Sequence, residues 1–423
     1  GEENQLKITT KYKVDIESTE VDREITSKLF NSLNSLLPEN ITYENFVNGS
    51  DVKNVVKTLT SDWLTTGPNI EKFEKDICKH VNSRYGVAVN SATSALHIAC
   101  KSLGLTNNDI LWTSSNTFVS SANCGLHCGA KIDLVDIDLK TQNISLIELE
   151  KKLVRAKKKK QLPKILVPVA FAGQSCEMKE IFKLSRKFKF KIVEDASHAL
   201  GARYLNDPVG NCKYSDITVF SFHPVKMITT GEGGIAVTND FQLYKKMRDF
   251  RSHGIDQIKK DKKKNRIRPW MFYQTSLGYN YRMTDIQASL GTSQLQKLKK
   301  FVKARNKISK IYNKELSSLP FQLPYINKGN LSSFHLYVVQ VKPNKKKVTR
   351  DILYKKLLAK KIITNIHYIP IYLHPFYKKL GLKKKDFPNN NEYFNRGISL
   401  PIYPSLKSNQ LNKIIKVIKY IFK

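Results

Sequence analysis

Short apolar runs alternate with amphipathic stretches between residues 86 and 240. Each run is a few residues long, as expected of a buried strand, and the stretch after most of them has the periodicity of a helix. The runs lie at 86–89, 109–112, 132–138, 164–173, 191–197, 217–222 and 233–240. This alternation is typical of βαβ units, so we expect an α/β fold with a mostly parallel sheet and helices on both faces.

Beyond residue 240 the pattern changes. Residues 284–316 read as one long helix, and further strands and helices follow it at 335–341, 349–361, 363–370 and 408–423. We therefore expect a large domain, 46–300, and a small α+β C-terminal domain, 301–423. Residues 1–45 are polar and weakly patterned, and we interpret them as an N-terminal extension.

The formal charge of +36 raises the possibility of a nucleic-acid-binding protein. Much of the excess lies in lysine runs that have no interleaved aromatic residues and no zinc-finger or RNA-binding signature. The runs lie at 156–160, 259–264, 345–347 and 383–385. We interpret them as solvated loops and expect no nucleic-acid partner, while attraction of anionic ligands by part of this charge stays open.

No apolar stretch approaches the roughly 20 residues that cross a bilayer, and the first residues lack the apolar core of a signal peptide. We therefore expect a cytoplasmic protein with no membrane partner. The six cysteines have no CxxC spacing, and Cys124 and Cys128 lie on an apolar helical stretch. We expect buried free thiols there, and neither a metal site nor a disulfide.

Asp195 and Lys226 form a candidate site. Asp195 follows the apolar run that begins at residue 191, so it would emerge at the carboxyl end of a strand, where ligands of parallel sheets bind. Lys226 lies between two strands in the glycine-containing segment SFHPVKMITTGEGG. Pyridoxal phosphate (PLP) needs an amine for a Schiff base and a carboxylate beside its pyridine nitrogen, and the pair suits both needs. Taken alone, Lys226 would read as one more solvated lysine.

A Ser/Thr-rich turn supplies a third part of the site. In VNSATSALHIA a strand ends and a helix begins, with Ala92 and Thr93 at the turn, so free N–H groups and the helix dipole can bind phosphate. Taken alone, this turn is more simply an ordinary helix cap. Ser221, just before the lysine segment, can donate its hydroxyl to the same phosphate. The conjunction of these features on successive strand ends predicts one PLP site.

Two further side chains can complete the pocket. Phe118, in SNTFVSSAN, can cover one face of the pyridine ring. His198, in EDASHALG, can press on the other face or reach the ring hydroxyl. Each can equally be a core residue.

These segments closely resemble those of the DegT/DnrJ/StrS family of nucleotide-sugar aminotransferases, which are PLP enzymes of fold type I. The resemblance runs from about Ser61 to the C-terminus, in the family's order and approximate spacing. Its motifs stand here as SDWLTTGPNIEKFE, NSATSAL, EDASHALG, SFHPVKMITTGEGGIAVTND, FRSHGI, GYNYRMTDIQASLG and NIHYIPIY. The resemblance implies a large domain with a seven-stranded, mostly parallel sheet, and a PLP-dependent transaminase activity.

Carried over to this sequence, the resemblance makes Lys226 the Schiff-base lysine and the group that moves the proton between the substrate carbon and the cofactor. Asp195 would pair with the pyridine nitrogen, and His198 would lie against the cofactor. The phosphate would be held by Ala92, Thr93 and Ser221. The resemblance also implies a homodimer, in which Asn280 and Arg282 of the partner's GYNYR segment reach into the site.

The family's sugar pocket maps onto two segments of this chain. Its residues would be Thr66, Gly67, His367 and Tyr368. For His367 and the nearby Tyr372, packing within the small domain is the alternative. Neither reading is decided by the residues themselves.

The form SFHPVKMITTGEGG, together with FRSHGI and HYIPIY, is most similar to the family's transaminases of the pseudaminic acid pathway. The implied reaction takes the amino group from L-glutamate, which leaves as 2-oxoglutarate, with pyridoxamine phosphate as the intermediate form of the cofactor. C4 of a UDP-linked 4-keto-6-deoxy-N-acetylhexosamine then receives the amino group, as a step of glycan biosynthesis.

Other functions stay open at this point. A member of the same fold can act on a 3-keto sugar, another 4-keto epimer or a keto-cyclitol, and a non-catalytic nucleic-acid-binding or regulatory protein is a remote alternative. A dehydratase is not expected, because family members that dehydrate carry histidine in place of Lys226. The chain departs from the pathway type at the N-terminal extension, at a lysine-rich insertion near 259–270, and at Met227, where proline is more usual.

Overall fold

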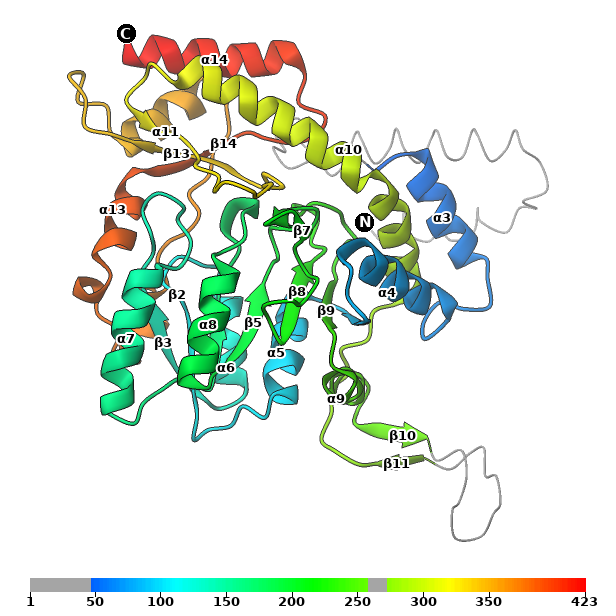
Figure 1. Ribbon diagram of the computed structural model, residues 1–423. Coiled ribbons are helices and arrows are strands. Elements are labelled where there is room, and N and C mark those ends of the chain that lie inside the picture. The colour runs from blue at the N-terminus through cyan, green and yellow to red at the C-terminus, as the bar shows by residue number, and fades with distance from the viewer. Residues whose placement is uncertain (1–46, 258–271) are drawn as a thin grey trace, which may run out of the picture.

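The computed structural model describes residues 47–257 and 272–423. Its main sheet has seven strands in the order β1-β9-β8-β5-β4-β2-β3, and only β9 runs antiparallel to its neighbours (Figure 1). These strands are β1 (Tyr85–Val89), β2 (Ile110–Ser114), β3 (Lys131–Val135), β4 (Ile165–Val167), β5 (Lys191–Asp195), β8 (Ile217–Ser221) and β9 (Gly234–Thr238). The prediction of a mostly parallel seven-stranded sheet is confirmed.

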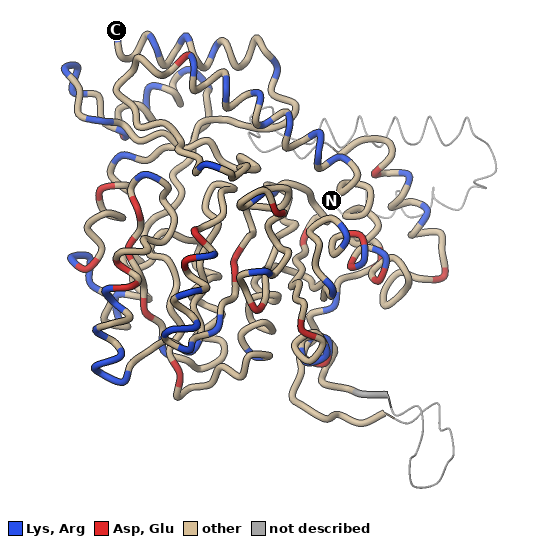
Figure 2. Tube along the Cα trace, in the orientation of Figure 1, with Lys and Arg blue, Asp and Glu red and all other residues tan. Residues whose placement is uncertain are grey.

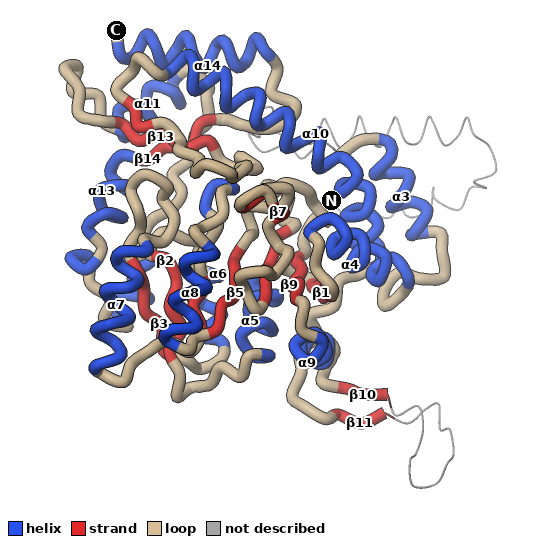
Figure 3. Tube along the Cα trace, in the orientation of Figure 1, coloured by secondary structure: helices blue, strands red, loops and turns tan. Residues whose placement is uncertain are grey.

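Helices cover both faces of this sheet, because successive residues of each strand point to opposite faces and both sets are apolar (Figure 3). On β8, Val219 packs toward the face of α5 and α6, whereas Phe220 packs toward the face of α7 and α8. The helices of the two faces are α4 (Pro68–Val81), α5 (Ala92–Ser102), α6 (Ser120–His127), α7 (Leu146–Lys158), α8 (Met178–Phe188) and α9 (Phe241–Arg251).

A long helix, α10 (Asp285–Leu316), packs against α3 (Gly49–Leu59) and α4 at one end and against α14 (Ser408–Phe422) at the other (Figure 1). Thr284 caps it in a capping box with Gln287. The prediction of a long helix over 284–316 is confirmed. Residue 300, the predicted domain boundary, lies inside α10, and the division into two domains at that residue stays a prediction.

A second, three-stranded sheet lies beyond α10 and has its own apolar cluster. Its strands are β12 (Phe321–Gln322), β13 (Tyr337–Val341) and β14 (Gly397–Leu400). Helices α11 (Arg350–Ala359) and α14 contribute to this cluster, and α13 (Pro388–Arg396) contacts β13. The short η2 (Ile371–Leu373) and α12 (Pro375–Lys379) pack instead in a cluster with α6 and β3, and η3 (Lys384–Asp386) contacts α13. Three smaller elements belong to the part of the chain that contains the large sheet. They are the short helix η1 (Phe171–Gly173), the two-stranded sheet of β6 (Arg203–Tyr204) and β7 (Asp207–Pro208), and the two-stranded sheet of β10 (Ile255–Gln257) and β11 (Phe272–Gln274).

The strand predicted at 363–370 is wrong. Only Asn365 pairs, with Ser399 of β14, and the chain then leaves the sheet. The reason is tertiary: the carbonyl oxygen of His367 accepts a hydrogen bond from the Tyr393 hydroxyl at 2.5 Å, and the Tyr368 hydroxyl lies 3.1 Å from His198 Nε2. These contacts hold the segment in a loop that local apolar pattern cannot distinguish from a strand.

Lys and Arg residues occur along helices throughout the described chain, including α10 and α14 (Figure 2). Within the described ranges, no helix is both long and apolar enough to pass through a bilayer.

The predicted N-terminal extension and the lysine-rich insertion near 259–270 lie outside the described residues. Cys124 and Cys128 are buried with free thiols, as expected.

Candidate active site

Lys226 faces a cavity of about 440 Å³ at the carboxyl ends of the parallel strands. It lies in the loop between β8 and β9, and its backbone N–H donates to the carbonyl oxygen of His223 at 2.8 Å. Burial lowers the pKa of the Lys226 amine to about 8, although the nearby Asp195 carboxylate acts in the opposite direction. A substantial fraction of the amine is therefore neutral near physiological pH, which is the form that acts as a nucleophile.

Asp195 is the last residue of β5, and its carboxylate is oriented by serine donors. Ser121 Oγ donates to Oδ2 at 2.6 Å, while the backbone N–H and the hydroxyl of Ser197 donate to Oδ1 at 3.1 and 2.5 Å. β5 pairs with β8 in a register that places Asp195 beside Val219, two residues before Ser221. The carboxyl ends of β5 and β8 therefore lie side by side, and the Asp195 carboxylate and the lysine loop line one cavity there, as expected for a parallel sheet.

The N-terminus of α5 forms another wall of the cavity. Ser91 caps the helix by accepting from the Ser94 N–H, so the turn is an ordinary cap as well. The N–H groups of Ala92 and Thr93 donate to no other described residue, and the Thr93 hydroxyl lies 2.8 Å from the Ser120 hydroxyl. These free donors at the positive end of a helix suit an anion.

Gly234 allows this helix terminus to approach β9. A Cβ at residue 234 would lie only 2.5 Å from the backbone nitrogen of Ala92 and 2.6 Å from its Cα, so no side chain fits without a shift of backbone. The position therefore demands glycine because of close approach, and not because of its backbone angles.

We expect Gly234→Ala to weaken PLP binding at least about 10-fold, because the added methyl group must displace the turn at Ala92, at a cost of about 1–3 kcal/mol for overpacking. Fluorescence titration of the cofactor-free protein with PLP measures this. Gly49→Ala, at a position with no atom near the added methyl group, is the control and should leave binding unchanged. Equal affinities of wild type and Gly234→Ala would contradict the proposed cradle.

Aromatic and imidazole rings line the rest of the cavity. Phe118 is 56% exposed, so it is not a core residue, and its ring centroid lies 6.0 Å from that of Tyr368. His198 is buried, and its Nε2 lies 3.1 Å from the Tyr368 hydroxyl. The pKa of His367 is lowered to about 4, first by burial and then by the charge of Lys226. His367 Nδ1 lies 2.8 Å from the Ser399 hydroxyl, which holds the ring at the cavity edge.

The lowered pKa of Lys226 has a measurable pH dependence. Only the neutral amine reacts with acetic anhydride, so labelling of Lys226 in the cofactor-free protein should rise about tenfold per pH unit below pH 8 and level off above it. Because the Asp195 charge raises this pKa, Asp195→Asn should move the midpoint to lower pH. Peptide mass spectrometry at each pH gives the profile, and a midpoint near the ordinary value of 10.5 would contradict the effect of burial.

Nine of the thirteen residues predicted for the site line this one cavity. They are Ala92, Thr93, Phe118, Asp195, His198, Ser221, Lys226, His367 and Tyr368. Thr66, Gly67, Asn280 and Arg282 do not line it. The Gly67 N–H instead donates to Asp285 Oδ2 at 2.6 Å. The backbone of Arg282 pairs with that of Val89 in an isolated antiparallel β-bridge. Tyr372 is buried, and its ring stacks on that of Phe387 with the two ring centroids 4.6 Å apart. For Tyr372 the structure therefore shows the packing role that was the alternative to a site role.

The sequence analysis missed several residues of the cavity. Ser121 and Ser197 orient Asp195, and both lie in segments already singled out, so a search for donors near the carboxylate could have found them. His335 also lines the cavity and was not considered. It lies at the start of an apolar run, where a histidine carries no local signal of function.

The residues of this cavity fit PLP. They offer two free backbone donors at a helix N-terminus for a phosphate, an amine of lowered pKa, and an oriented carboxylate. His198 Nδ1 is buried and has no partner among the described residues, so the cavity also contains an unfilled polar position. The volume of about 440 Å³ lies within the range that is typical of small-molecule and cofactor sites.

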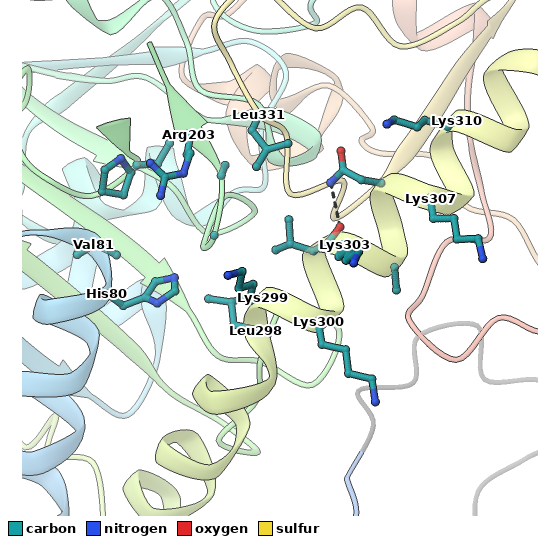
Figure 4. A pocket seen from close by; sticks show the side chains of 17 residues that line it. His80, Val81, Arg203, Leu298, Lys299, Lys300, Lys303, Lys307, Lys310 and Leu331 are labelled. Carbon is teal, nitrogen blue, oxygen red and sulfur yellow. Dashed lines mark hydrogen bonds between the residues drawn. The ribbon is translucent and has the colours of Figure 1, made fainter. Parts of the chain in front are cut away.

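A second, larger cavity of about 950 Å³ lies between α10 and the β6–β7 hairpin (Figure 4). Figure 4 shows a series of α10 lysines on one side and Arg203 with His80 on the other. The lysines are Lys299, Lys300, Lys303, Lys307 and Lys310. None of the predicted site residues lines this cavity, so cavity size alone does not locate the active site.

Comparison with known proteins gives consistent results. Residues 47–419 match the model of the DegT/DnrJ/EryC1/StrS aminotransferase family. The UDP-4-amino-4,6-dideoxy-N-acetyl-beta-L-altrosamine transaminase of Campylobacter jejuni is 37% identical over 361 residues, which cover 85% of this chain and 91% of the relative.

Two solved structures are similar in fold and sequence. Helicobacter pylori PseC, an aminotransferase involved in the biosynthesis of pseudoaminic acid, superposes with a TM-score of 0.82 and 30% identity over 91% of this chain and 99% of its own. The sugar aminotransferase Spr1654 of Streptococcus pneumoniae, solved in its PLP form, has a TM-score of 0.79 and 28% identity over 89% of this chain and 96% of its own.

Proposed function

Because the chain belongs to the DegT/DnrJ/EryC1/StrS aminotransferase family, a family of PLP-dependent sugar aminotransferases, we propose that it moves the amino group of L-glutamate to C4 of a UDP-linked 4-keto-6-deoxy-N-acetylhexosamine. The observation that carries the proposal is the meeting of Lys226, Asp195 and the N-terminus of α5 around one cavity. The choice of sugar rests on the Campylobacter and Helicobacter relatives.

Lys226 has two tasks in this proposal. Its amine holds the cofactor covalently between turnovers, and in each half-reaction Nζ takes a proton from one carbon and delivers it to another. A pKa of about 8 suits both directions of transfer near neutral pH. When bound, PLP withdraws electrons from the carbon that loses the proton.

The remaining residues bind and orient. Asp195 keeps the pyridine nitrogen protonated, His198 lies against the ring, and Phe118 covers the exposed side. Ala92, Thr93 and Ser221 hold the phosphate. We assign His367 and Tyr368 to the sugar pocket, which is supported by their place at the edge of the same cavity.

We further propose a homodimer in which Asn280 and Arg282 complete the partner's site and the Thr66–Gly67 turn lines its sugar pocket. These residues lie outside their own chain's cavity, and apolar side chains near them are exposed. Leu277 is 78% exposed and Trp63 is 53% exposed, as is common at protein interfaces.

Mixing two inactive variants tests this arrangement. If Lys226→Ala and the double variant N280A/R282A are refolded together, heterodimers contain one complete site, so activity should recover to about a quarter of the wild-type value. If each chain builds its whole site alone, the mixture will show only the sum of the separate variants.

The function itself is tested by spectroscopy with defined substrates. The protein with bound PLP should show a visible absorption band that L-glutamate bleaches and that one of a panel of UDP-4-keto-6-deoxy-N-acetylhexosamine epimers restores. Restoration by a 3-keto sugar or a keto-cyclitol alone would replace the proposed acceptor. Absence of any band after addition of PLP would contradict the cofactor.

A further inference from the structure

His198 is enclosed by rings, and the nearest of them belongs to His335. The centroids of the two imidazoles are 4.3 Å apart with an interplanar angle of 47°, whereas the rings of Phe171 and Tyr368 lie at 6.0 and 6.2 Å. The described hydrogen bond of the His198 side chain runs from Nε2 to the Tyr368 hydroxyl. A ring held by one hydrogen bond can still pivot about it, so its tilt depends on the rings packed against it, of which His335 is the nearest.

The fold ties the His335 segment directly to His198. The hydroxyl of Ser333 donates to the backbone oxygen of His198 at 2.7 Å, and the N–H of Ser333 donates to Gly173 at 3.0 Å. Gly173 has φ of +102°, and a Cβ there would lie 2.3 Å from the Ser333 hydroxyl oxygen. Glycine is therefore required for the two segments to approach this closely.

A buried arginine holds the backbone of the His335 segment through hydrogen bonds. Arg305 of α10 donates through Nη1 to three carbonyl oxygens, those of Phe334 at 3.3 Å, His335 at 3.2 Å and Ile402 at 2.7 Å. Its side chain is buried and has no carboxylate partner among the described residues. Burying a guanidinium whose described partners are only carbonyl oxygens costs free energy, and losing one of these hydrogen bonds would raise that cost. The carbonyl groups that accept from Arg305, including that of His335, are therefore held firmly in place.

Burial favours the neutral form of both imidazoles. Burial lowers the pKa of His335 well below its usual range, and His198, Lys226, Arg305 and His367 lower it further. Burial and the charge of Lys226 do the same for His198. Two neutral rings can pack without charge repulsion, and neither adds a positive charge beside the Lys226 amine.

We propose that His335 is a positioning residue, whose ring sets the tilt of His198 against the flat cofactor while Arg305 holds its backbone in place. This inference rests on the proposed role of His198 as the residue that lies against PLP. His335 acts through shape, because its Nδ1 has no partner among the described residues. A phenyl ring at residue 335 should therefore replace it, whereas a methyl group should not.

The test compares His335→Ala with His335→Phe in the protein loaded with PLP. We expect His335→Ala to weaken PLP binding about 5- to 10-fold, as for loss of one ring contact, and to reduce the circular dichroism that the site induces in the cofactor band. His335→Phe should restore at least half of that signal. Phe188→Ala, which removes a buried ring from α8, should lower the melting temperature without changing the cofactor signal.

A double-mutant cycle shows whether His335 acts through His198. In the His198→Ala background, His335→Ala should change PLP affinity less than 2-fold, because the residue it positions is already gone. An unchanged full effect in that background, or a His335→Phe variant as impaired as His335→Ala, would overturn the inference. If the wild-type protein binds no PLP, the proposed function fails. If it binds PLP and His335→Ala has the same PLP affinity and the same circular dichroism in the cofactor band, only this inference fails.

Discussion

Lys226→Ala is expected to lower kcat by at least about 10³-fold, the largest effect of any single substitution in this chain. Under the proposed roles of Lys226, the variant loses both the amine that binds PLP covalently and the group that moves the proton, and removal of a general acid–base group alone typically costs 10²–10⁴-fold. The visible band of the covalent lysine–cofactor linkage should be absent, although PLP can still bind without it. Steady-state assays with L-glutamate and the keto-sugar, together with the absorption spectrum, measure both effects.

Two controls make this result specific. Lys303→Ala removes a lysine from the larger cavity beside α10 and should leave kcat unchanged (Figure 4). A small primary amine added to Lys226→Ala should restore part of the proton transfer, because it can enter the space that the side chain leaves. If Lys303→Ala is as inactive as Lys226→Ala, or if Lys226→Ala retains more than a tenth of wild-type activity, the assignment of the site is wrong.

Asp195→Ala is expected to lower kcat by about 10²–10³-fold. Without this carboxylate the pyridine nitrogen loses the group proposed to keep it protonated, so the ring withdraws electrons poorly and the proton on the substrate carbon is harder to remove. The loss should fall on kcat more than on the dissociation constant of PLP, because the phosphate cradle at α5 is untouched. Kinetics with the two half-reactions measured separately will show this split.

Glu194→Gln provides a matched control for Asp195. Glu194 is the preceding residue of β5, and it is a buried carboxyl whose pKa is raised to about 7, chiefly by burial. It does not line the cavity of Lys226, and it accepts instead from Thr218 Oγ1 at 3.0 Å. An amide of nearly the same shape should leave kcat within about 3-fold of wild type. A loss equal to that of Asp195→Ala would mean that buried charge on β5, and not contact with the cofactor, sets the rate.

The excess of lysine could be interpreted only in part from the sequence. The runs at 156–160 and 383–385 were assigned to solvated segments, but the lysines that line the larger cavity are spread over α10 and form no run. Residues three and four apart lie on the same side of a helix, so Lys299, Lys303 and Lys310 share a face only when the helix is formed. The predicted helix already implied this shared lysine face, but only the tertiary structure showed that Arg203 and His80 line the same cavity.

The sequence by itself determined the sheet, its helices and the centre of the site. Short continuous apolar runs between helical stretches identify buried strands, and ligands of parallel sheets bind at strand ends, so the sequence predicts that Asp195, Ala92 and Lys226 lie together. None of these residues indicates a site when taken alone, and it is their conjunction on successive strand ends that predicts one. The motif resemblance added the reaction, the class of sugar substrate and the homodimer.

Only the tertiary structure decided which distant segments meet around that centre. His335 comes to lie beside His198 through Arg305 and the Gly173 turn, and the 363–370 segment leaves the sheet to place His367 and Tyr368 at the cavity. Some of the contacts behind these arrangements join residues more than a hundred positions apart, such as Ser333 with His198 and Tyr368 with His198. Local periodicity contains no information about such contacts, because the same apolar and polar pattern is compatible with a strand edge, a core loop or a cavity wall.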